Sequence, residues 1–514
     1  LTSFTAFSTG NDPFADLLKK LEEFTAKYTQ EKVYLHLDKP YYAVGDDIWF
    51  KGYIVDAKSS APSLISNILY IELINDKDSI VNQIKRPIEN GITWGDFKLA
   101  DTLKEGNYRI RAYTQWMRNS STDFFFDKTI KIGNSWSNEV FTKASTLLST
   151  EGNTDKISST IQFNDKEGKP YANTEVTYEV QVNNKNISRG KLTTNLNGEI
   201  TIGFNNSSIS TKTAKIITTF TVDKKKITKT IPIKTTSNLT DVQFFPEGGT
   251  LVEGLPSRIG IKAVNANGLG EDITGIIIDN TGAEILKFET SYLGMGSLFL
   301  SPEAGKAYTA KVKFANGNEK TLALPKIEKS GYTLSINNTD SAKVTIKVML
   351  SADLLNTGEL KLVTHHNGGV YFVSKIPTTK QFATITLPKK EMFSGIVQFT
   401  LFNSANIPVN ERIVFVNNSS DKIDLALQNL KPSYTKREKV DLNFNAINNA
   451  EPVQGSFSIS VTNTSAVTPD LANESNILTH LLLTSDLKGY IEKPNTYFLN
   501  NNSKTLANLD HLLL

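Results

Sequence analysis

The residues that could do chemistry in this sequence are few and scattered. Cysteine is absent, and the 514 residues contain five histidines: His36, His365, His366, His480 and His511. The pair His365-His366 precedes Asn367-Gly368-Gly369, which would suit a metal site. Neighbours on a strand, however, point to opposite faces of a sheet and converge poorly on one ion. We therefore expect no metal site and no cofactor.

Motifs of the common enzyme classes are also missing. The sequence has no His-Glu-x-x-His of zinc proteases and no Gly-x-Ser-x-Gly of serine hydrolases. Residues 164–168 lack the alternating carboxylates of a calcium loop. The glycines of residues 244–249 predict a tight turn after a buried strand, because no Lys-Ser/Thr pair or helix follows to hold a phosphate. We expect no catalytic residue and no enzymatic activity.

Length and composition indicate several globular domains. A chain of 514 residues exceeds the roughly 250 residues that one hydrophobic core supports. Its 39% hydrophobic and 21% charged residues suit a folded protein. A net charge of +3 argues against a nucleic-acid-binding protein. No apolar run approaches the ~20 residues that a membrane-spanning helix needs, so we expect no transmembrane segment.

The stretch from Val33 to Val55 organises the rest of the chain. Its first half alternates apolar and polar residues, which predicts a half-buried strand. Lys39-Pro40 ends that strand, because proline cannot donate a ladder hydrogen bond. Gly45-Asp46 forms a second turn, after which an apolar strand begins at Ile48.

This pattern resembles the opening of the macroglobulin-type β-sandwich domain found in alpha-2-macroglobulin and its bacterial relatives. The matching residues, to which the resemblance gives a structural role, are Asp38, Lys39, Pro40, Tyr42, Gly45 and Asp46. Residues 244–249 and 481–494 are also similar to bacterial macroglobulin-like envelope proteins. Such relatives often carry a plug domain of the TonB-dependent transporter type after this region. The missing cysteine excludes the thioester of the classical members.

A second motif predicts the closing strands of each sandwich. Gly106 stands two residues before Tyr108, followed by alternating strand residues, which resembles the tyrosine corner of immunoglobulin-like sandwiches. The same unit recurs before Tyr308, and the opening unit recurs as Lys431-Pro432-Ser433-Tyr434 with Glu438 in place of Asp46. Repetition at roughly 90 residues matches the size of a seven-stranded sandwich.

The predicted architecture is all-β: tandem immunoglobulin-like, macroglobulin-type sandwiches with a short N-terminal helix and C-terminal helical segments. We expect a polar linker at Ser145–Asp155. The predicted units are an N-terminal lead and amphipathic helix (1–30), four sandwiches (31–134, 150–236, 239–328 and 330–418) and an incomplete fifth sandwich with a helical insertion (420–514). The first residues fit a disordered lead or the remnant of a signal peptide.

Three features could bind a partner. The helix from Asp12-Pro13 carries one apolar stripe, which we expect to pack on the first sandwich, with partner docking as the alternative. The four tryptophans are expected in the first core; the alternative is a recognition surface with Trp116 beside Arg118 at a hairpin tip. The last leucines, including Leu512 and Leu513, are expected to be uncovered and to need a partner.

The function predicted from these observations is a non-enzymatic scaffold that binds protein partners in a Gram-negative outer-membrane transport or assembly complex. We expect an exported protein on the periplasmic or the surface side. One alternative is a macroglobulin-like protease trap without thioester, although no bait segment is evident. Another is a carbohydrate-binding surface array, which exposed coplanar aromatic residues on the first unit would favour.

Overall fold

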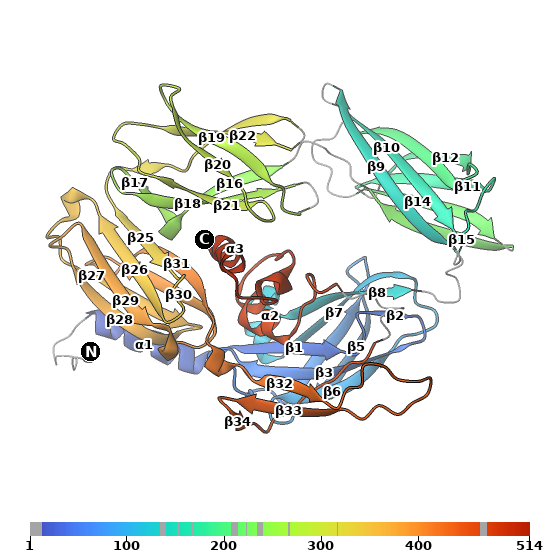
Figure 1. The fold of residues 1–514 in the computed structure, drawn as a ribbon, viewed down its shortest axis with the longest axis horizontal. Helices are drawn as coiled ribbons and strands as arrows, with labels where there is room; N and C mark the ends of the chain where they lie inside the picture. The colour runs from blue at the N-terminus through green and yellow to red at the C-terminus, as the bar shows by residue number, and fades with distance from the viewer. Residues whose placement is uncertain are drawn as a thin grey trace.

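The computed structural model consists mainly of β-strands, arranged as tandem β-sandwiches with few helices (Figure 1). The structure describes residues 13–133, 140–151, 154–165, 168–183, 185–206, 214–222, 224–233, 240–265, 268–315, 317–462 and 470–514. The predicted lead (residues 1–11) and the predicted N-cap residue Asp12 lie outside this range. The sandwich prediction for the fold class is confirmed by the sheets themselves.

The first sandwich packs a three-stranded sheet against a five-stranded one. The smaller sheet has the order β1 (Glu31–Leu37), β3 (Asp47–Asp56), β6 (Ile92–Lys98). The larger has the order β2 (Tyr41–Ala43), β8 (Phe126–Gly133), β7 (Gly106–Thr114), β4 (Ile68–Ile74), β5 (Ile80–Pro87). Apolar residues from both sheets form one continuous core between them.

The second sandwich begins earlier than the sequence predicts. Its sheets are β13 (Glu199–Asn206), β10 (Thr154–Asn164), β9 (Phe141–Glu151) and β12 (Lys185–Thr193), β11 (Glu175–Val182), β14 (Ala214–Val222), β15 (Lys225–Pro232). The predicted linker at Ser145–Asp155 was wrong, because β9 and β10 pair there in an antiparallel hairpin. Its serines and threonines stand in adjacent pairs, Ser145-Thr146 and Ser149-Thr150, so the strand shows no alternation of apolar and polar residues.

The third sandwich contains β16 (Asp241–Pro246), β18 (Ser257–Val264), β21 (Met295–Leu300) facing β20 (Glu284–Glu289), β19 (Ile273–Asp279), β22 (Tyr308–Phe314), β23 (Glu319–Ala323). The short strands β17 (Leu251–Val252) and β24 (Ile327–Glu328) pair in parallel beside them. The 3-10 turn η3 (Glu247–Gly249) follows β16, and Gly248 adopts φ +77° there.

The fourth sandwich pairs β25 (Tyr332–Asn337), β26 (Lys343–Leu350), β29 (Phe382–Pro388) with β28 (Gly369–Pro377), β27 (Glu359–His366), β30 (Gly395–Phe402), β31 (Pro408–Val416). In β26 every second side chain is buried, from Val344 to Leu350. This is the period of a strand with one face toward a core.

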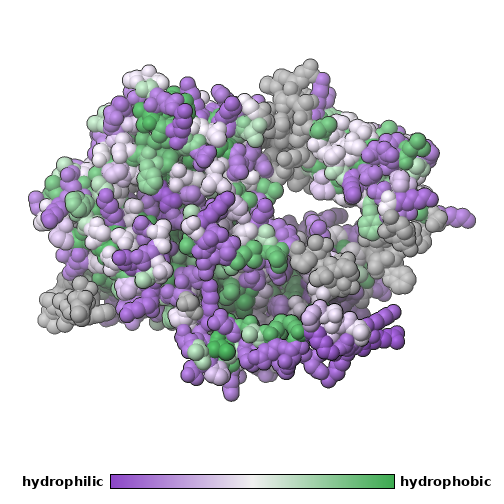
Figure 2. Space-filling view, in the orientation of Figure 1, coloured by the Kyte–Doolittle hydropathy of each residue, from purple (hydrophilic) through white to green (hydrophobic). Residues whose placement is uncertain are grey.

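In the described part of the last hundred residues, the chain forms one small sheet and a helical segment. The sheet has the order β32 (Asp424–Gln428), β33 (Asn443–Asn448), β34 (Glu451–Pro452), and all residues of β32 are exposed. Figure 2 shows apolar surface at the lower edge of the molecule, over these strands. Helices α2 (Ile477–Leu482) and α3 (Ser503–Leu513), with the 3-10 turns η7 (Thr484–Asp486) and η8 (Pro494–Tyr497), complete the chain.

The N-terminal helix α1 (Pro13–Lys27) packs against the fourth sandwich and not against the first. The ring of Phe14 is almost fully buried, 5.9 Å from that of Phe402 on β30, and the ammonium of Lys361 lies 5.4 Å from its centre. Figure 1 shows the helix along the lower edge of this sandwich. The apolar stripe identified a buried face, but its partner is more than 300 residues away in the sequence, beyond the reach of a local pattern.

Candidate functional site

The C-terminal helical segment, residues 470–514, lies in the centre of the molecule between the first, third and fourth sandwiches (Figure 1). We call it the central wedge. Its apolar side chains share one core with Met295 of the third sandwich and with Ile396 and Phe415 of the fourth. The wedge members of this core are Leu483, Tyr497, Leu509 and Leu513. The wedge therefore joins separate sandwiches by a common hydrophobic contact.

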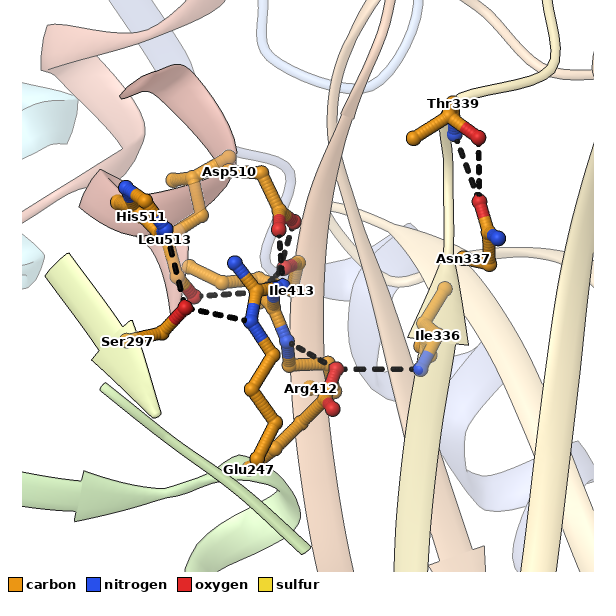
Figure 3. Close-up of polar contacts among 11 residues, drawn as sticks. Glu247, Ser297, Ile336, Asn337, Thr339, Arg412, Ile413, Asp510, His511 and Leu513 are labelled. Carbon is orange, nitrogen blue, oxygen red and sulfur yellow. Dashed lines mark hydrogen bonds and ion pairs between the residues drawn. The ribbon is translucent and has the colours of Figure 1, made fainter. Parts of the chain in front are cut away.

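Arg412 on β31 is the centre of the most buried polar contacts in this junction (Figure 3). Its side chain is 1% exposed, and its Nε lies 3.1 Å from Oε1 of Glu247. Its two other nitrogens reach the wedge, one donating to the carbonyl oxygen of Leu513 at 2.6 Å and the other to Asp510 at 2.7 Å. One guanidinium thus binds a carboxylate of the third sandwich and two acceptors of α3.

Glu247 is held at this place by the turn η3. The glycine that follows it, Gly248, takes a left-handed conformation, and a Cβ there would meet the backbone of Leu334 at 3.0 Å. The same carboxylate oxygen also accepts from the backbone N–H of Ile336 at 3.1 Å. A buried carboxylate with both an ionic and a backbone partner is stabilised, whereas one that loses its cation is strongly destabilising.

A second arginine extends the junction into the third sandwich. Arg258 on β18 contacts Asp510 and also donates to Ser297 at 3.1 Å. Nε2 of His511 lies 3.1 Å from the same serine hydroxyl (Figure 3). Burial, together with the nearby charge of Arg258, lowers the pKa of His511, so the imidazole is neutral at pH 7. Asp510 is therefore shared by two arginines from two different sandwiches.

The opposite end of the wedge binds the first sandwich through buried polar contacts. Lys32 on β1 pairs with Asp486 at 2.8 Å, and both side chains are less than 10% exposed. Lys32 also donates to the carbonyl oxygen of Leu481 at 2.8 Å. Asn367 of the fourth sandwich donates to Asp486 at 3.3 Å and to the carbonyl oxygen of Ala57 at 2.9 Å. One aspartate thus ties three parts of the chain together.

These contacts are mechanical in character. The charged groups at both ends of the wedge form ion pairs and hydrogen bonds with the neighbouring sandwiches. Across the part of the chain that the structure describes, no group of three or more histidines and carboxylates could hold a metal ion. What the arrangement can do is fix the relative positions of three sandwiches.

The structure explains the opening motif of the first sandwich residue by residue. The hydroxyl of Tyr42 donates to Asp38 at 2.7 Å, and the same carboxylate oxygen accepts from the backbone N–H of Trp49 at 3.0 Å. Lys39 pairs with Asp46 at 2.8 Å, and Asp46 also accepts from the backbone of Ala43. Pro40 directs the turn between them, and Gly45 adopts φ +82°. The motif is a network that closes two turns.

The repeat of this motif forms equivalent contacts. The hydroxyl of Tyr434 accepts from the backbone N–H of Lys431 at 2.9 Å, as that of Tyr42 does from Lys39 at 3.3 Å. The ammonium of Lys431 pairs with Glu438, which replaces the aspartate of the first copy. The sequence comparison between the two segments therefore identified a real geometric repeat.

Both corner tyrosines are buried, each 5% exposed. The hydroxyl of Tyr108 donates to the carbonyl oxygen of Lys104 at 2.8 Å. The hydroxyl of Tyr308 accepts from the backbone N–H of Glu303 at 3.0 Å. In both, the phenol fixes the loop that precedes its own strand, which is the geometry expected for a tyrosine corner.

The predicted partner surface at the end of the chain was wrong. Leu513 is 5% exposed, and Leu512 and Leu514 are half-buried. They pack on the third and fourth sandwiches, and the side chain of Leu514 lies directly over Gly260 of β18. A run of leucines identifies an apolar face, but only the tertiary structure shows that the chain covers this face itself.

Trp116 and Arg118 lie on the 3-10 turn η1 (Trp116–Asn119) after β7. Trp116 is half-buried, and its indole N–H donates to the carbonyl oxygen of Thr29 at 2.5 Å. It borders a shallow cavity of about 440 Å³ whose walls also include Ile68 and Tyr70. Arg118 is exposed. The two residues are neighbours, but Trp116 also holds the connection between α1 and β1 against η1.

The other tryptophans depart from the predicted core. Trp49 and Trp94 are 58% and 63% exposed, and Trp136 lies outside the described residues. The alternation of β3 sends Ile48 and Phe50 inward, so Trp49 points outward. The alternation of apolar and polar positions in that segment already indicated an outward Trp49. The prediction of a buried tryptophan relied instead on the usual burial of aromatic residues.

The two neighbouring histidines have different environments. His366 is buried, with Nδ1 2.6 Å from the carbonyl oxygen of Ile396. His365 is half-buried, and burial lowers its pKa. The buried His480 of the wedge was not singled out from the sequence, although it packs between the rings of Tyr34 and Phe126. Its burial lowers its pKa to about 4.

Comparison with known proteins adds no family assignment. No protein-family model matches the sequence, and no curated protein matches it. Among solved structures, native alpha-2-macroglobulin of Escherichia coli is similar at 11% identity, with a TM-score of 0.33, over 82% of this chain and 31% of that one. Salmonella alpha-2-macroglobulin reacted with methylamine is similar at 11% identity, with a TM-score of 0.33, over 82% of this chain and 32% of that one. The chain thus spans about a third of the length of these macroglobulins.

A tetra-tandem repeat in the extending region of a large adhesion protein is also similar, at 12% identity with a TM-score of 0.17, over 76% of this chain and 100% of that one. The BSP domain of a biofilm-associated protein is similar at 10% identity with a TM-score of 0.23, over 76% of this chain and 96% of that domain. At such scores the fold class depends on the observed sheets and not on these likenesses. Within the described residues, no helix is both long and apolar enough to cross a membrane.

Proposed function

We propose that this chain is a non-enzymatic scaffold: a rigid frame of β-sandwiches that holds protein partners in a complex. The observation that carries the proposal is the central wedge, whose buried ion pairs and apolar core fix three sandwiches to one another. Such contacts resist relative motion, since separating them would expose charges and apolar side chains together. A frame of this kind suits a structural role.

A second part of the proposal concerns the cellular location of the protein and the type of complex in which it acts. We propose an exported protein of a Gram-negative cell envelope, associated with the outer membrane and acting in a transport or assembly complex. Its support is the resemblance of the opening motif and of residues 481–494 to bacterial macroglobulin-like envelope proteins. The absence of cysteine agrees with a scaffold that does not capture its partner covalently.

We propose β32 as the surface for the partner, in place of the predicted C-terminal leucines, of which Leu513 is buried. Leu425 and Leu427 on this strand are 60% and 57% exposed. In the described residues, β32 is the outer strand of the sheet β32-β33-β34, so one of its edges is open. Uncovered apolar surface of this kind marks interaction sites, and an open edge can pair with another strand.

The test is isolation of the tagged, full-length protein from envelopes of its source bacterium in mild detergent after cross-linking. We expect a stoichiometric membrane-protein partner. The variant Leu425→Asp/Leu427→Asp should lose it, whereas Leu147→Asp, also at a highly exposed leucine but on β9, should keep it. Recovery of the chain alone would contradict the scaffold. Cleavage by varied proteases at one inter-domain segment, with compaction around the protease, would favour the trap.

A further inference from the structure

Two uncovered indoles lie side by side on the outer face of the first sandwich. Trp49 on β3 and Trp94 on β6 are the most exposed tryptophans that the structure describes. The strands pair with Trp49 opposite Asp96 and Trp94 opposite Lys51, so the two indoles occupy diagonal positions on one face. Diagonal neighbours lie roughly 7–8 Å apart, and their Cβ atoms somewhat less, so one extended ligand can reach both indoles.

The rest of this sheet face is covered by the chain itself. The hydroxyl of Ser458 lies 2.6 Å from Nδ1 of His36 and 2.8 Å from the hydroxyl of Tyr53. Lys51 donates to the carbonyl oxygen of Phe457 at 3.0 Å. This segment contacts His36, Lys51 and Tyr53, whereas Trp49 and Trp94 remain more than half exposed. Their exposure is thus a local property of this end of the sheet.

The neighbours of the indoles on the same face are charged. Asp47 and Lys98 pair with each other across β3 and β6 and are exposed. The side chain of Asp96 is 41% exposed, 3.7 Å from that of Arg86. Both indoles are therefore bordered by hydrogen-bonding groups of either charge.

A sugar ring has the complementary chemistry. Its C–H face is apolar and flat and packs on an aromatic ring, while its hydroxyls point outward to hydrogen-bonding groups. The charges around the indoles include both signs, which favours a neutral ligand over a polyanion or polycation. We propose that Trp49 and Trp94 form a platform that binds a glycan chain of neutral pyranose units, with Asp47, Asp96 and Lys98 as hydroxyl partners.

The test measures binding of soluble hexasaccharides to the intact chain by calorimetry, with cellohexaose, maltohexaose, chitohexaose and mannohexaose as probes. We expect at least one to bind at up to millimolar concentration. Trp49→Ala and Trp94→Ala should each weaken that binding by about tenfold, and the double variant should abolish it. Because both side chains are exposed, the fold should persist, which circular dichroism will verify. Phe299→Ala, at an aromatic residue 73% exposed on β21, is the matched control and should bind normally.

Three results would overturn the platform. The first is the failure of every probe to bind, and the second is binding that both tryptophan variants retain. The third is a concentration-dependent dimer in sedimentation velocity that the double variant loses, since this would identify the face as an interface between two copies of the chain.

Discussion

Removal of the Arg412 guanidinium is the sharpest test of the central wedge. Arg412→Met keeps an unbranched apolar stem but leaves the carboxylate of Glu247 buried beside only its backbone partner. Breaking a buried ion pair in this way costs about 3–5 kcal/mol. Asp510 retains Arg258, so the loss should fall on the junction of η3, β31 and α3.

The double variant Arg412→Met/Glu247→Gln separates charge from packing. The glutamine oxygen can still accept from Ile336, and no buried charge remains, so the double variant should be more stable than Arg412→Met alone. Arg109→Met, which breaks solvent-exposed pairs with Asp78 and Asp127, is the matched surface control and should cost at most about 1 kcal/mol.

Hydrogen exchange during mild urea titration is the suitable assay, because a chain of several sandwiches does not unfold in two states. The amides of α3 and β31 should lose protection in Arg412→Met, while those of the second sandwich should not change. The reasoning would be refuted if the local free energy of opening fell by less than about 1 kcal/mol, or if the double variant were as unstable as the sum of its parts.

Three further outcomes are expected. Tyr108→Phe should lower the stability of the first sandwich by about 1–2 kcal/mol, because the carbonyl oxygen of Lys104 loses its donor; unchanged hydrogen-exchange protection of β7 in urea would contradict the corner geometry. Burial lowers the pKa of His480 to about 4, against about 6.5 in an unfolded chain. As the pH falls below 6.5, the unfolded chain therefore takes up a proton that the folded chain does not, and the free energy of unfolding declines by up to about 3 kcal/mol toward pH 4. His480→Leu should flatten this acid dependence, and an equal slope in both proteins would assign it to other groups. A zinc soak should give no anomalous peak at His365 and His366, and a stoichiometric peak there would disprove the argument from strand alternation.

The sequence was most informative where a structure is made by local rules. Alternating residues predicted strands because a strand has only two faces, and the segment from Asp38 to Asp46 predicted its turn because those side chains bond within a few residues of one another. Tyr108 belongs to the same class, since its phenol reaches back only to Lys104. Local signals also have a limit, because the polar hairpin around Ser145 was taken for a linker.

Tertiary structure decided every contact between distant parts of the chain. Phe14 packs on the fourth sandwich, and Leu513 is covered by strands that precede it by about a hundred residues. Neither Arg412 nor Glu247 stands in a motif, since one salt bridge between residues 165 positions apart leaves no periodic trace. Whether an outward-pointing side chain is open also depends on the whole fold: His36 and Trp49 project from the same sheet face, but a segment more than 400 residues later covers only the first.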